Sequence, residues 1–477
     1  MFSYLTQPEG KTLEFKRDLS SPLPVLRTLI AFANSAGGRV VIGVDDARNV
    51  IGVEDPLAEE ERLCNMVADS IEPRLVPNVE LQTVEGKTLL IAEVFPGSGR
   101  PYSLKKEGRE QGVYVRLGSS NRLADRELIG ELQRSVEGRA FDEMPLPDLT
   151  VEALDLTAAQ ELFGAQRKLD QKTLLALRLL CHEQGRLVPT KGALLLFGKE
   201  RLAYFPDAWI QCGRFLGKSK SHIFDHIEIN EPLPRAVESM LSFLKKHADR
   251  GADLSQLQRK DIWSIPLTIL REVLVNAVVH ADYSQRGGPL RVAFFDDRIE
   301  VENPGILLPG MTIEDMKLGV SKIRNPVIAR VFRELGLIEQ WGSGIRRVFE
   351  QAAESQLLEP QILEVGLRLR VIIPLLESAR KGEPQRNKKS EQVGEQVGEQ
   401  VGEQVGTILQ ACTQGPKTRK ELLAAAGLAN VYLNYKRHLL SLVEQGCLAM
   451  THPEKPTSRL QRYRLTEKGK QRLATRN

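Results

Sequence analysis

The stretch IPLTILREVLVNAVVHADY, residues 265–283, repeats its apolar residues with the period of an α-helix. Glu272, Asn276 and His280 are spaced four residues apart, so they lie on one face of that helix. Three polar side chains stacked on an otherwise apolar helix are costly to bury unless something satisfies them. A nucleotide with its Mg²⁺ would do so, and the stretch therefore predicts a ligand-binding helix.

Two strands and a glycine-containing turn follow this helix. The segment PLRVAFFDDRIEVENPG, residues 289–305, predicts two strands joined by a hairpin at 296–297. Its second strand ends in ENPG at 302–305, a turn that lets backbone approach a ligand. Further along, GSG at 342–344 directly precedes a helix. Glycines there leave backbone N–H groups free to meet phosphate.

In this order and spacing, these blocks resemble the GHKL ATPase fold shared by gyrase and histidine kinases, in the divergent form found near helicase-related transcriptional regulators. The resemblance implies an α/β sandwich over residues 150–378, with a helical lead-in, that binds ATP and Mg²⁺. In it, Glu272 would orient or deprotonate the attacking water and Asn276 would coordinate Mg²⁺. The Asp-x-Gly-x-Gly motif of the superfamily is absent, so Glu302 or Asn303 would replace its adenine contact.

The nucleotide contacts expected from this resemblance extend from the helix to the last glycine turn. They are Asn276, His280, Glu302, Asn303, Gly305, Arg324, Asn325, Gly342, Ser343 and Gly344. Two alternatives stay open at this point. His280 could instead pair with Asp282 at the helix end, and the domain could be a structural one that has lost its nucleotide.

The first part of the chain, residues 1–143, alternates expected strands and helices. EGKTLEFK carries Glu9 and Glu14, and it is followed by an expected helix in LPVLRTLIAFANSAGG. RVVIGVDD has the apolar run of a buried strand, and GVYVRLGSSNRLA predicts a β-hairpin.

These separated motifs, from LEFKRDL to GSSNRLA, resemble the Schlafen AlbA_2 domain, which implies a nucleic-acid-binding α/β domain. In Schlafen-type nucleases, three carboxylates hold a divalent metal that cleaves RNA. By this resemblance the carboxylates would be Glu9, Glu14 and either Asp45 or Asp46. The same residues also have a structural interpretation, in which Glu14 pairs with Lys16 along a strand and GVDD is a polar strand end.

The clearest boundary is the segment 379–406, in which ARKGEPQRNKKS precedes four EQVG repeats. It predicts a fraying helix or flexible tether, with a coiled-coil contact as the alternative. Beyond it, residues 407–477 hold 13 Lys and Arg against 4 Asp and Glu, whereas residues 1–406 carry a net charge of −5. Positive charge gathered in a small terminal domain is typical of a protein that binds a phosphate backbone.

This basic block predicts three helices followed by a hairpin. Thr418 is the expected N-cap of the second helix, and Gly427 is its C-cap signal. The order is that of a winged helix-turn-helix, whose second helix of the pair enters the major groove while the wing touches backbone. The block resembles the C-terminal winged-helix domain of bacterial regulators and Fic-family proteins, which often follows EQVG-like repeats. A protein-docking module is the alternative.

Composition narrows the classes of protein further. No run of 18 apolar residues exists, and the N-terminus lacks the apolar stretch of a signal peptide, so we expect a water-soluble cytoplasmic protein without membrane contact. The five cysteines lie far apart, which indicates reduced structural thiols and not a zinc site. A Walker-type motor is not expected, because no G-x-x-x-x-G-K-[ST] motif occurs.

The sequence therefore predicts a multidomain protein of mixed α/β and α+β class. Its expected function is ATP-binding, DNA-binding transcriptional regulation, in which the nucleotide state modulates how the flanking domains engage double-stranded DNA. The alternatives are a Mg²⁺- or Mn²⁺-dependent nuclease acting on RNA or single strands, and a docking scaffold. A homo-oligomer is expected. The expected nucleic-acid contacts are Lys16, Arg116, Arg122, Asn434, Lys436, Arg437, Lys455, Arg459 and Arg462.

Overall fold

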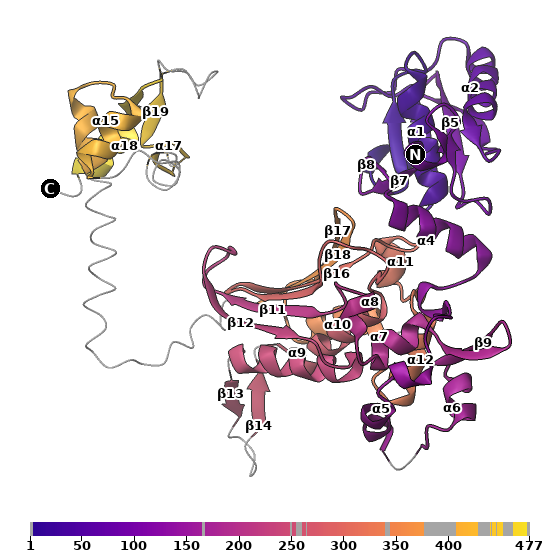
Figure 1. The fold of residues 1–477 in the computed structure, drawn as a ribbon. Coiled ribbons are helices and arrows are strands. Elements are labelled where there is room, and N and C mark those ends of the chain that lie inside the picture. The colour runs from indigo at the N-terminus through magenta and orange to yellow at the C-terminus, as the bar shows by residue number, and fades with distance from the viewer. Residues whose placement is uncertain are drawn as a thin grey trace, which may run out of the picture. The chain divides into compact units, whose positions relative to one another are not determined.

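The chain divides into two compact units, Met1–Gly382 and Glu383–Asn477. The computed structural model describes residues 3–164, 167–248, 250–253, 260–263, 265–338, 344–375, 407–427, 439, 441–444, 446–451 and 461–474 (Figure 1). The linker expected at 379–406 lies outside these residues. Within the described residues, no helix is both long enough and apolar enough to span a membrane.

The first unit begins with a four-stranded sheet in the order β1-β2-β5-β4. Its strands are β1 (Leu13–Lys16), β2 (Gly38–Ile42), β4 (Asn78–Val84) and β5 (Lys87–Val94). Helix α1 (Pro22–Asn34) connects β1 to β2, which run parallel, and the other neighbours are antiparallel. The tight turn after α1 requires its two glycines. Gly37 has a φ of +82°, and a Cβ on Gly38 would lie 2.7 Å from the carbonyl oxygen of Thr12.

Further helices and short strands complete this part of the unit. They are η1 (Ser3–Thr6), α2 (Pro56–Ser70), β3 (Ile71–Glu72), β6 (Ser103–Leu104), α3 (Gly108–Gln111), β7 (Tyr114–Leu117), β8 (Ser120–Leu123) and α4 (Arg126–Glu137). β7 and β8 form the expected hairpin, and α1 packs against β2 and β7. Asp125 caps α4 by accepting the N–H of Leu128, and α4 leads from this sheet toward the next one (Figure 1).

A six-stranded mixed sheet forms the centre of the unit, in the order β12-β11-β15-β16-β18-β17. Its strands are β11 (Ile210–Phe215), β12 (Ile223–Ile229), β15 (Leu290–Phe294), β16 (Arg298–Pro304), β17 (Gln361–Val365) and β18 (Arg368–Pro374). β11 and β15 pair in parallel, and the other pairs are antiparallel. The hairpin expected at 296–297 is confirmed as the connection between β15 and β16.

Helices cover one face of this sheet (Figure 1). They are α9 (Leu233–His247) and α10 (Leu267–Val279), which contact its strands, while α13 (Gly344–Glu354) packs on α10, and α12 (Pro326–Glu334) contributes to the same apolar core. Helix α10 contacts α9, α13 and strand β16. Its buried Val273, Leu274 and Val278 belong to one apolar core with Val292 and Val301 of the sheet. Burial of this apolar face fixes α10 against the sheet and thereby fixes where its polar face points.

The remaining elements of the unit are short. They are η2 (Phe141–Glu143), η3 (Val151–Ala153), α5 (Leu156–Phe163), α6 (Gln171–Ala176), β9 (Leu180–Glu183), β10 (Arg186–Pro189), α7 (Lys191–Phe197), α8 (Arg201–Tyr204), β13 (Arg250–Asp253), β14 (Lys260–Trp263) and α11 (Ile313–Lys317). One of these elements, η2, is hydrogen-bonded to a segment far along the chain. The buried Asp142 of η2 accepts the backbone N–H groups of Val327 and Ile328 at the first turn of α12, at 2.8 and 3.0 Å.

The second unit has a small core of its own. Its described elements after the helical turns at 407–411 are η6 (Cys412–Gln414), α15 (Arg419–Ala425), α17 (Ser441–Glu444), β19 (Leu448–Met450), β20 (Tyr463–Leu465) and α18 (Glu467–Ala474). Thr418 caps α15 in a capping box with Glu421, as expected from the sequence. β19 and β20 pair as an antiparallel hairpin. Leu422, Leu439 and Leu442 are buried in the core.

Candidate functional site

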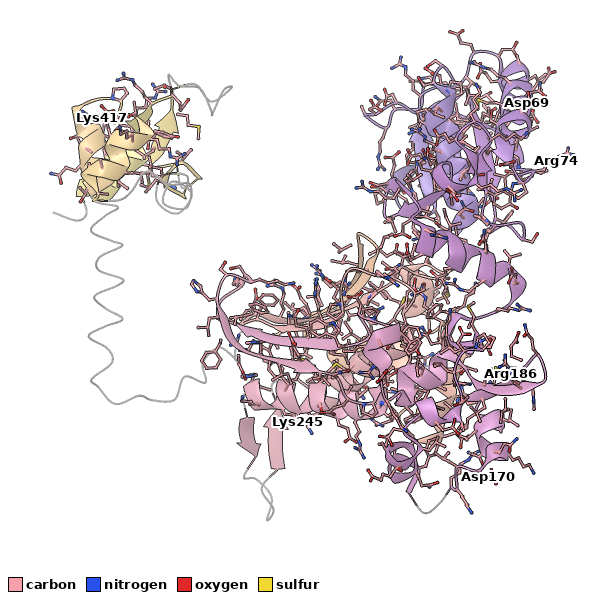
Figure 2. The ribbon with its side chains drawn as sticks, viewed as in Figure 1. Asp69, Arg74, Asp170, Arg186, Lys245 and Lys417 are labelled. Atoms are coloured by element: carbon pink, nitrogen blue, oxygen red, sulfur yellow. The ribbon has the colours of Figure 1, made fainter. Side chains whose placement is uncertain are left out.

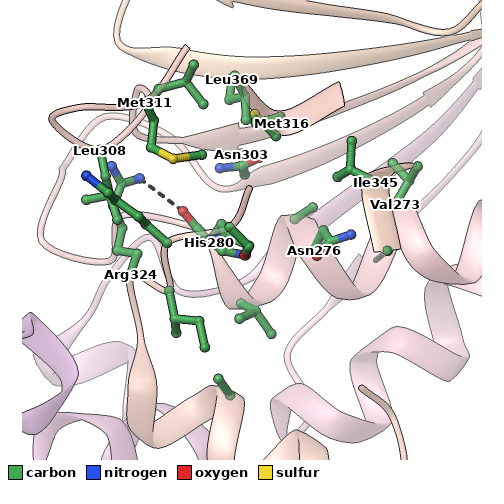
Figure 3. A pocket seen from close by; sticks show the side chains of 18 of the residues that line it. Val273, Asn276, His280, Asn303, Leu308, Met311, Met316, Arg324, Ile345 and Leu369 are labelled. Carbon is green, nitrogen blue, oxygen red and sulfur yellow. Dashed lines mark hydrogen bonds between the residues drawn. The ribbon is translucent and has the colours of Figure 1, made fainter. Parts of the chain in front are cut away.

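The polar face of α10 borders a cavity of about 440 Å³ (Figure 3). Glu272, Asn276 and His280, the residues singled out by their spacing, all line it. The amide Nδ2 of Asn276 donates a hydrogen bond to Oε1 of Glu272 over 3.1 Å. This bond orients the amide. A carboxylate and an amide that are bonded to each other on one helix face therefore line the cavity.

The rest of the cavity wall comes from the sheet, from α12 and α13, and from residues 305–324, here called the rim segment. The side chains that give it an apolar character are Val273, Ala277, Val279, Ile306, Leu307, Leu308, Met311, Met316, Val320, Ile323, Ala329, Ile338, Ile345, Leu369 and Val371. Its basic residues are Lys322, Arg324, Arg333 and Arg347, and Glu272 is the one carboxylate among the described residues that line it. A mostly apolar cavity with a few convergent polar groups is typical of a small-molecule site, and its charge favours an anion.

Gly344, at the start of α13, lies so close to the side chain of Glu272 that no larger residue fits there. A Cβ at this position would lie 1.7 Å from Oε1 of Glu272, which is the atom that accepts from Asn276. Any residue larger than glycine would displace the carboxylate. The glycine is therefore required for the approach of α13 to α10, and the first turn of α13 borders the cavity.

Strand β16 decides between the two candidates for a base contact. Successive residues of a strand point to opposite faces, and Asn303 lines the cavity whereas Glu302 does not. The carboxylate of Glu302 forms ion pairs with Arg370 and Arg368 of the neighbouring strand β18, at 2.6 Å each. The expectation that Glu302 contacts the ligand is therefore wrong for this arrangement, because the residue is engaged on the other face of the sheet. Asn303 stays a candidate.

Arg324 and Asn325 are both engaged in bonds that hold the site together. Arg324 is buried and donates to the carbonyl oxygen of His280 (Figure 3) and to that of Ile306, while its Nε donates to Glu131 of α4 at 2.7 Å. It also lines the cavity. Asn325 is fully buried and donates to two backbone carbonyls at the end of α10. Asn325 does not line the cavity, so the structure gives it a positioning role in place of the expected ligand contact.

His280 ends α10 and is half-buried beside the rim segment. Burial, with a smaller contribution from the positive charge of Arg324, lowers the pKa of His280 to about 4. The imidazole is therefore neutral at pH 7. The alternative partner, Asp282, accepts hydrogen bonds from the backbone N–H and the hydroxyl of Ser284.

The carboxylates expected at a nuclease centre are each held in local bonds. Glu14 forms ion pairs with Lys16 at 2.5 Å and with Arg116 at 2.6 Å, as the structural interpretation expected for Lys16. Oε1 of Glu9 accepts the N–H of Phe15, and Asp45 accepts the N–H of Asn49. Across the described part of the chain, no group of three or more His, Cys, Asp and Glu residues is placed to hold a metal ion.

Two of the expected nucleic-acid contacts are likewise engaged in bonds within the chain. Arg116 is only 1% exposed and donates to Asn121, Glu14 and the carbonyl of Gly10, so it is not a surface contact as expected. Lys16 is tied to Glu14. The exposed side chains of Arg122 and Arg462 are available to a partner. Gly342, Ser343, Asn434, Lys436, Arg437, Lys455 and Arg459 lie outside the described residues.

Several cavity residues carried no signal in the sequence. Lys322 and the two methionines, Met311 and Met316, come from the rim segment, which has no helical or strand periodicity over most of its length. Arg333 and Arg347 lie on amphipathic helices, where a basic residue is ordinary. These residues can be recognised as cavity residues only from the structure, where they lie around the same space.

Glu131 makes a pH-dependent contribution to stability at the contact between α4 and the rim segment. Burial raises the pKa of Glu131 to about 7, against the opposing effect of Arg324. A carboxyl whose pKa is higher in the folded than in the unfolded chain contributes stability below the unfolded pKa, and this contribution is lost as pH rises through the folded pKa. Urea unfolding from about pH 5 to about pH 8 should therefore show a falling free energy of unfolding, with a total change of about 1–3 kcal/mol from this residue.

The control for this prediction is Glu131→Gln, which cannot ionise. Its free energy of unfolding should vary less with pH than that of the wild type. Asp142, whose pKa burial also raises to about 7, keeps part of the dependence in both proteins. An identical pH profile in the two proteins would show that Glu131 stays ionised throughout.

Family models match three separate parts of this chain. Residues 9–125 match "Schlafen, AlbA_2", residues 287–373 match HATPase_c_4, described as "Putative ATP-dependent DNA helicase recG C-terminal", and residues 403–466 match "Filamentation induced by cAMP protein Fic-like, C-terminal domain". The chain thus combines an AlbA_2, a HATPase_c_4 and a Fic-like C-terminal domain. This confirms the resemblances on which the sequence interpretation was built.

The cavity lies largely within the HATPase_c_4 domain. That match includes β15, β16 and the rim segment, and it continues through α12, α13 and most of β18. Helix α10, which supplies Glu272, Asn276 and His280, directly precedes it. The AlbA_2 match includes the sheet β1-β2-β5-β4 and the β7–β8 hairpin.

Two solved structures are similar to parts of the chain. The DIP2311 protein from Corynebacterium diphtheriae is 19% identical over 90% of this chain and 87% of its own, with a TM-score of 0.41. The N-terminal domain of a putative ATP-dependent DNA helicase RecG-related protein from Nitrosomonas europaea is 30% identical over 26% of this chain and 88% of its own, with a TM-score of 0.21. No curated protein matches the chain significantly.

Proposed function

We propose that this protein is an ATP-binding transcriptional regulator in which nucleotide bound to the HATPase_c_4 domain changes how the chain engages DNA. The observation that carries the nucleotide part is the cavity beside α10. It joins an apolar wall to four basic side chains and a single carboxylate, within a domain whose family description names ATP-dependent proteins. A purine ring would pack on the apolar wall, and a triphosphate would pair with the basic side chains.

The residues that would hold ATP divide by chemistry. Met311, Met316 and Leu369 offer an apolar surface for the base, with Asn303 as its polar partner. Lys322, Arg333 and Arg347 offer positive charge for the phosphates. Asn276 would coordinate Mg²⁺, and Glu272 would orient or deprotonate the attacking water. When bound, Mg·ATP would supply a phosphoanhydride bond and a dense negative charge beside the rim segment.

The DNA part of the proposal rests on the second unit. Its residues 407–477 are strongly basic, and its described elements include a capped helix followed by an antiparallel hairpin, two elements that a winged helix-turn-helix requires. Arg462 is exposed directly before β20 of that hairpin, where a wing would touch DNA backbone. The Fic-like match includes both elements.

Contacts of the rim segment support coupling between nucleotide and the AlbA_2 domain. The N–H of Gly310 donates to the carbonyl of Ser35 at the end of α1, at 2.9 Å. Glu364 accepts both the N–H of Leu307 and the ammonium group of Lys11. A nucleotide that reorders the rim segment would therefore act on bonds to the AlbA_2 domain.

The test is nucleotide-dependent DNA binding. We expect the affinity of the wild type for duplex DNA, measured by fluorescence anisotropy, to change about fivefold or more when Mg·ATP is added. Asn276→Ala and Glu272→Ala should remove that change while leaving DNA binding without nucleotide intact. Asn78→Ala, a matched amide removed from the exposed strand β4, should behave as the wild type. Equal nucleotide dependence in all four proteins would refute the coupling.

A further inference from the structure

A second cavity, of about 340 Å³, lies between the AlbA_2 side of the first unit and the rim segment. We call it the junction cavity. It is lined by Arg100, Glu131, Arg134, Ser135, Gly138, Arg139, Ala140, Phe141, Glu143, Asp282, Leu308, Pro309, Lys322, Ile323, Arg324 and Pro326. Leu308, Lys322, Ile323 and Arg324 also line the cavity beside α10, which is called the nucleotide cavity below. The two cavities therefore share one wall.

The carboxylates of the junction cavity are mostly neutralised by partners. Glu131 is bonded to Arg324, and Glu143 forms an ion pair with Arg178. Asp282 is almost fully buried and is bonded to Ser284. Little negative charge is left to oppose the basic side chains of this cavity.

Four basic side chains of the cavity have no carboxylate partner among the described residues: Arg100, Arg134, Arg139 and Lys322. The Nε of Arg100 is buried and lacks a hydrogen-bond partner within that same part of the chain. Arg134 makes one long bond, 3.4 Å, to the hydroxyl of Ser284, and Lys322 donates to the carbonyl of Pro309. A half-buried guanidinium with an unused donor is costly unless an anion completes it.

The shape and position of the cavity favour a phosphodiester of a polynucleotide. A guanidinium group can bind two phosphate oxygens at once, and three of the four arginines that line this cavity have no carboxylate partner among the described residues. Arg139 and Lys322 are exposed, so a chain longer than one nucleotide can continue outward. Phe95, which is 67% exposed, belongs to the same loop as Arg100 and offers a stacking surface for a base.

We propose that the junction cavity binds a backbone phosphate of a polynucleotide held by the AlbA_2 domain, directly behind the wall of the nucleotide cavity. The inference rests on the proposed function in so far as the chain binds nucleic acid. It adds a location for that contact and a physical route for the coupling. Because Lys322 and Arg324 face both cavities, filling one changes the charge that the other presents.

Arg139→Ala is the first test, because this side chain is exposed and its loss should not impair folding. Arg100→Ala/Arg139→Ala is the second, with its thermal unfolding checked by circular dichroism. Arg74→Ala and Arg186→Ala remove the same charge from other exposed positions of the unit (Figure 2) and serve as matched controls. Each protein is titrated against a short labelled DNA strand, the RNA strand of the same sequence, and the DNA duplex, over a series of salt concentrations.

The expected result is about fivefold weaker polynucleotide binding in Arg139→Ala, and no such change in the controls. The slope of log affinity against log salt concentration should also become shallower by about one unit, as expected for the loss of one phosphate contact. Cavity variants that match the controls would overturn the inference while leaving nucleic-acid binding elsewhere intact. Direct binding of pyrophosphate by a wild type that binds no polynucleotide, lost in Arg139→Ala, would overturn the polynucleotide assignment and show a small-anion site instead. Absence of any polynucleotide binding would overturn both this inference and the DNA part of the proposed function. Mg·ATP titration of Arg139→Ala reports separately on the nucleotide cavity.

Discussion

Replacing Gly344 with alanine should lower the affinity for Mg·ATP about tenfold or more, which corresponds to ~1.4 kcal/mol or more. The added Cβ would sit 1.7 Å from Oε1 of Glu272, so the carboxylate has to move. That oxygen accepts the hydrogen bond that orients Asn276, and the amide would lose its fixed position at the cavity. The new methyl group would also enter the space where the first turn of α13 meets the cavity. Isothermal titration of Mg·ATP into the variant measures the loss.

The matched control is Gly10→Ala, at a glycine where the nearest atom to an added Cβ is 3.9 Å away. It should bind Mg·ATP as the wild type does. Both variants should unfold near the wild-type temperature, because Glu272 has a flexible side chain that can swing aside. Undiminished binding by Gly344→Ala would mean that the pair Glu272 and Asn276 does not contact the nucleotide.

Replacing Glu14 with alanine should lower the free energy of unfolding by about 3–5 kcal/mol. Glu14 is 8% exposed, and its partner Arg116 is 1% exposed. Removing the carboxylate would leave a buried guanidinium without its counter-charge, and the remaining acceptors of Arg116 are the Asn121 side chain and backbone carbonyls. Urea unfolding monitored by circular dichroism measures the change.

Glu93→Ala is the control for this prediction, because it breaks a more exposed ion pair, that of Glu93 with Arg39. Its cost should be about 1 kcal/mol or less. A Glu14→Ala protein that is as stable as the wild type, but that loses a Mn²⁺-dependent cleavage of RNA, would contradict the structural role and favour the nuclease alternative.

The parts of the site that were predictable depend on local periodicity. A helix that buries one face must present Glu272, Asn276 and His280 together, and the spacing of four residues is visible in the chain itself. The β15–β16 hairpin follows from two apolar runs around paired aspartates. For the same reason the N-cap at Thr418 was predictable from the residues that follow it.

The remainder depends on contacts between segments far apart in the chain. Strand alternation says that Glu302 and Asn303 face opposite ways, but only the arginines of β18 reveal which one turns from the cavity. An arginine in a polar hairpin is normally exposed, and Arg116 is buried because Glu14, more than a hundred residues earlier, meets it. The basic wall of the cavity is assembled from the rim segment, α12 and α13, which no local pattern joins.

The most direct test of this account is a calorimetric titration of Mg·ATP into the full chain and into Asn276→Ala. The account predicts saturable binding at one site per chain in the wild type, and a loss of about tenfold or more in the variant. Equal binding by the two proteins, or no binding of Mg·ATP to the wild type, would contradict the assignment of the cavity beside α10 to a nucleotide.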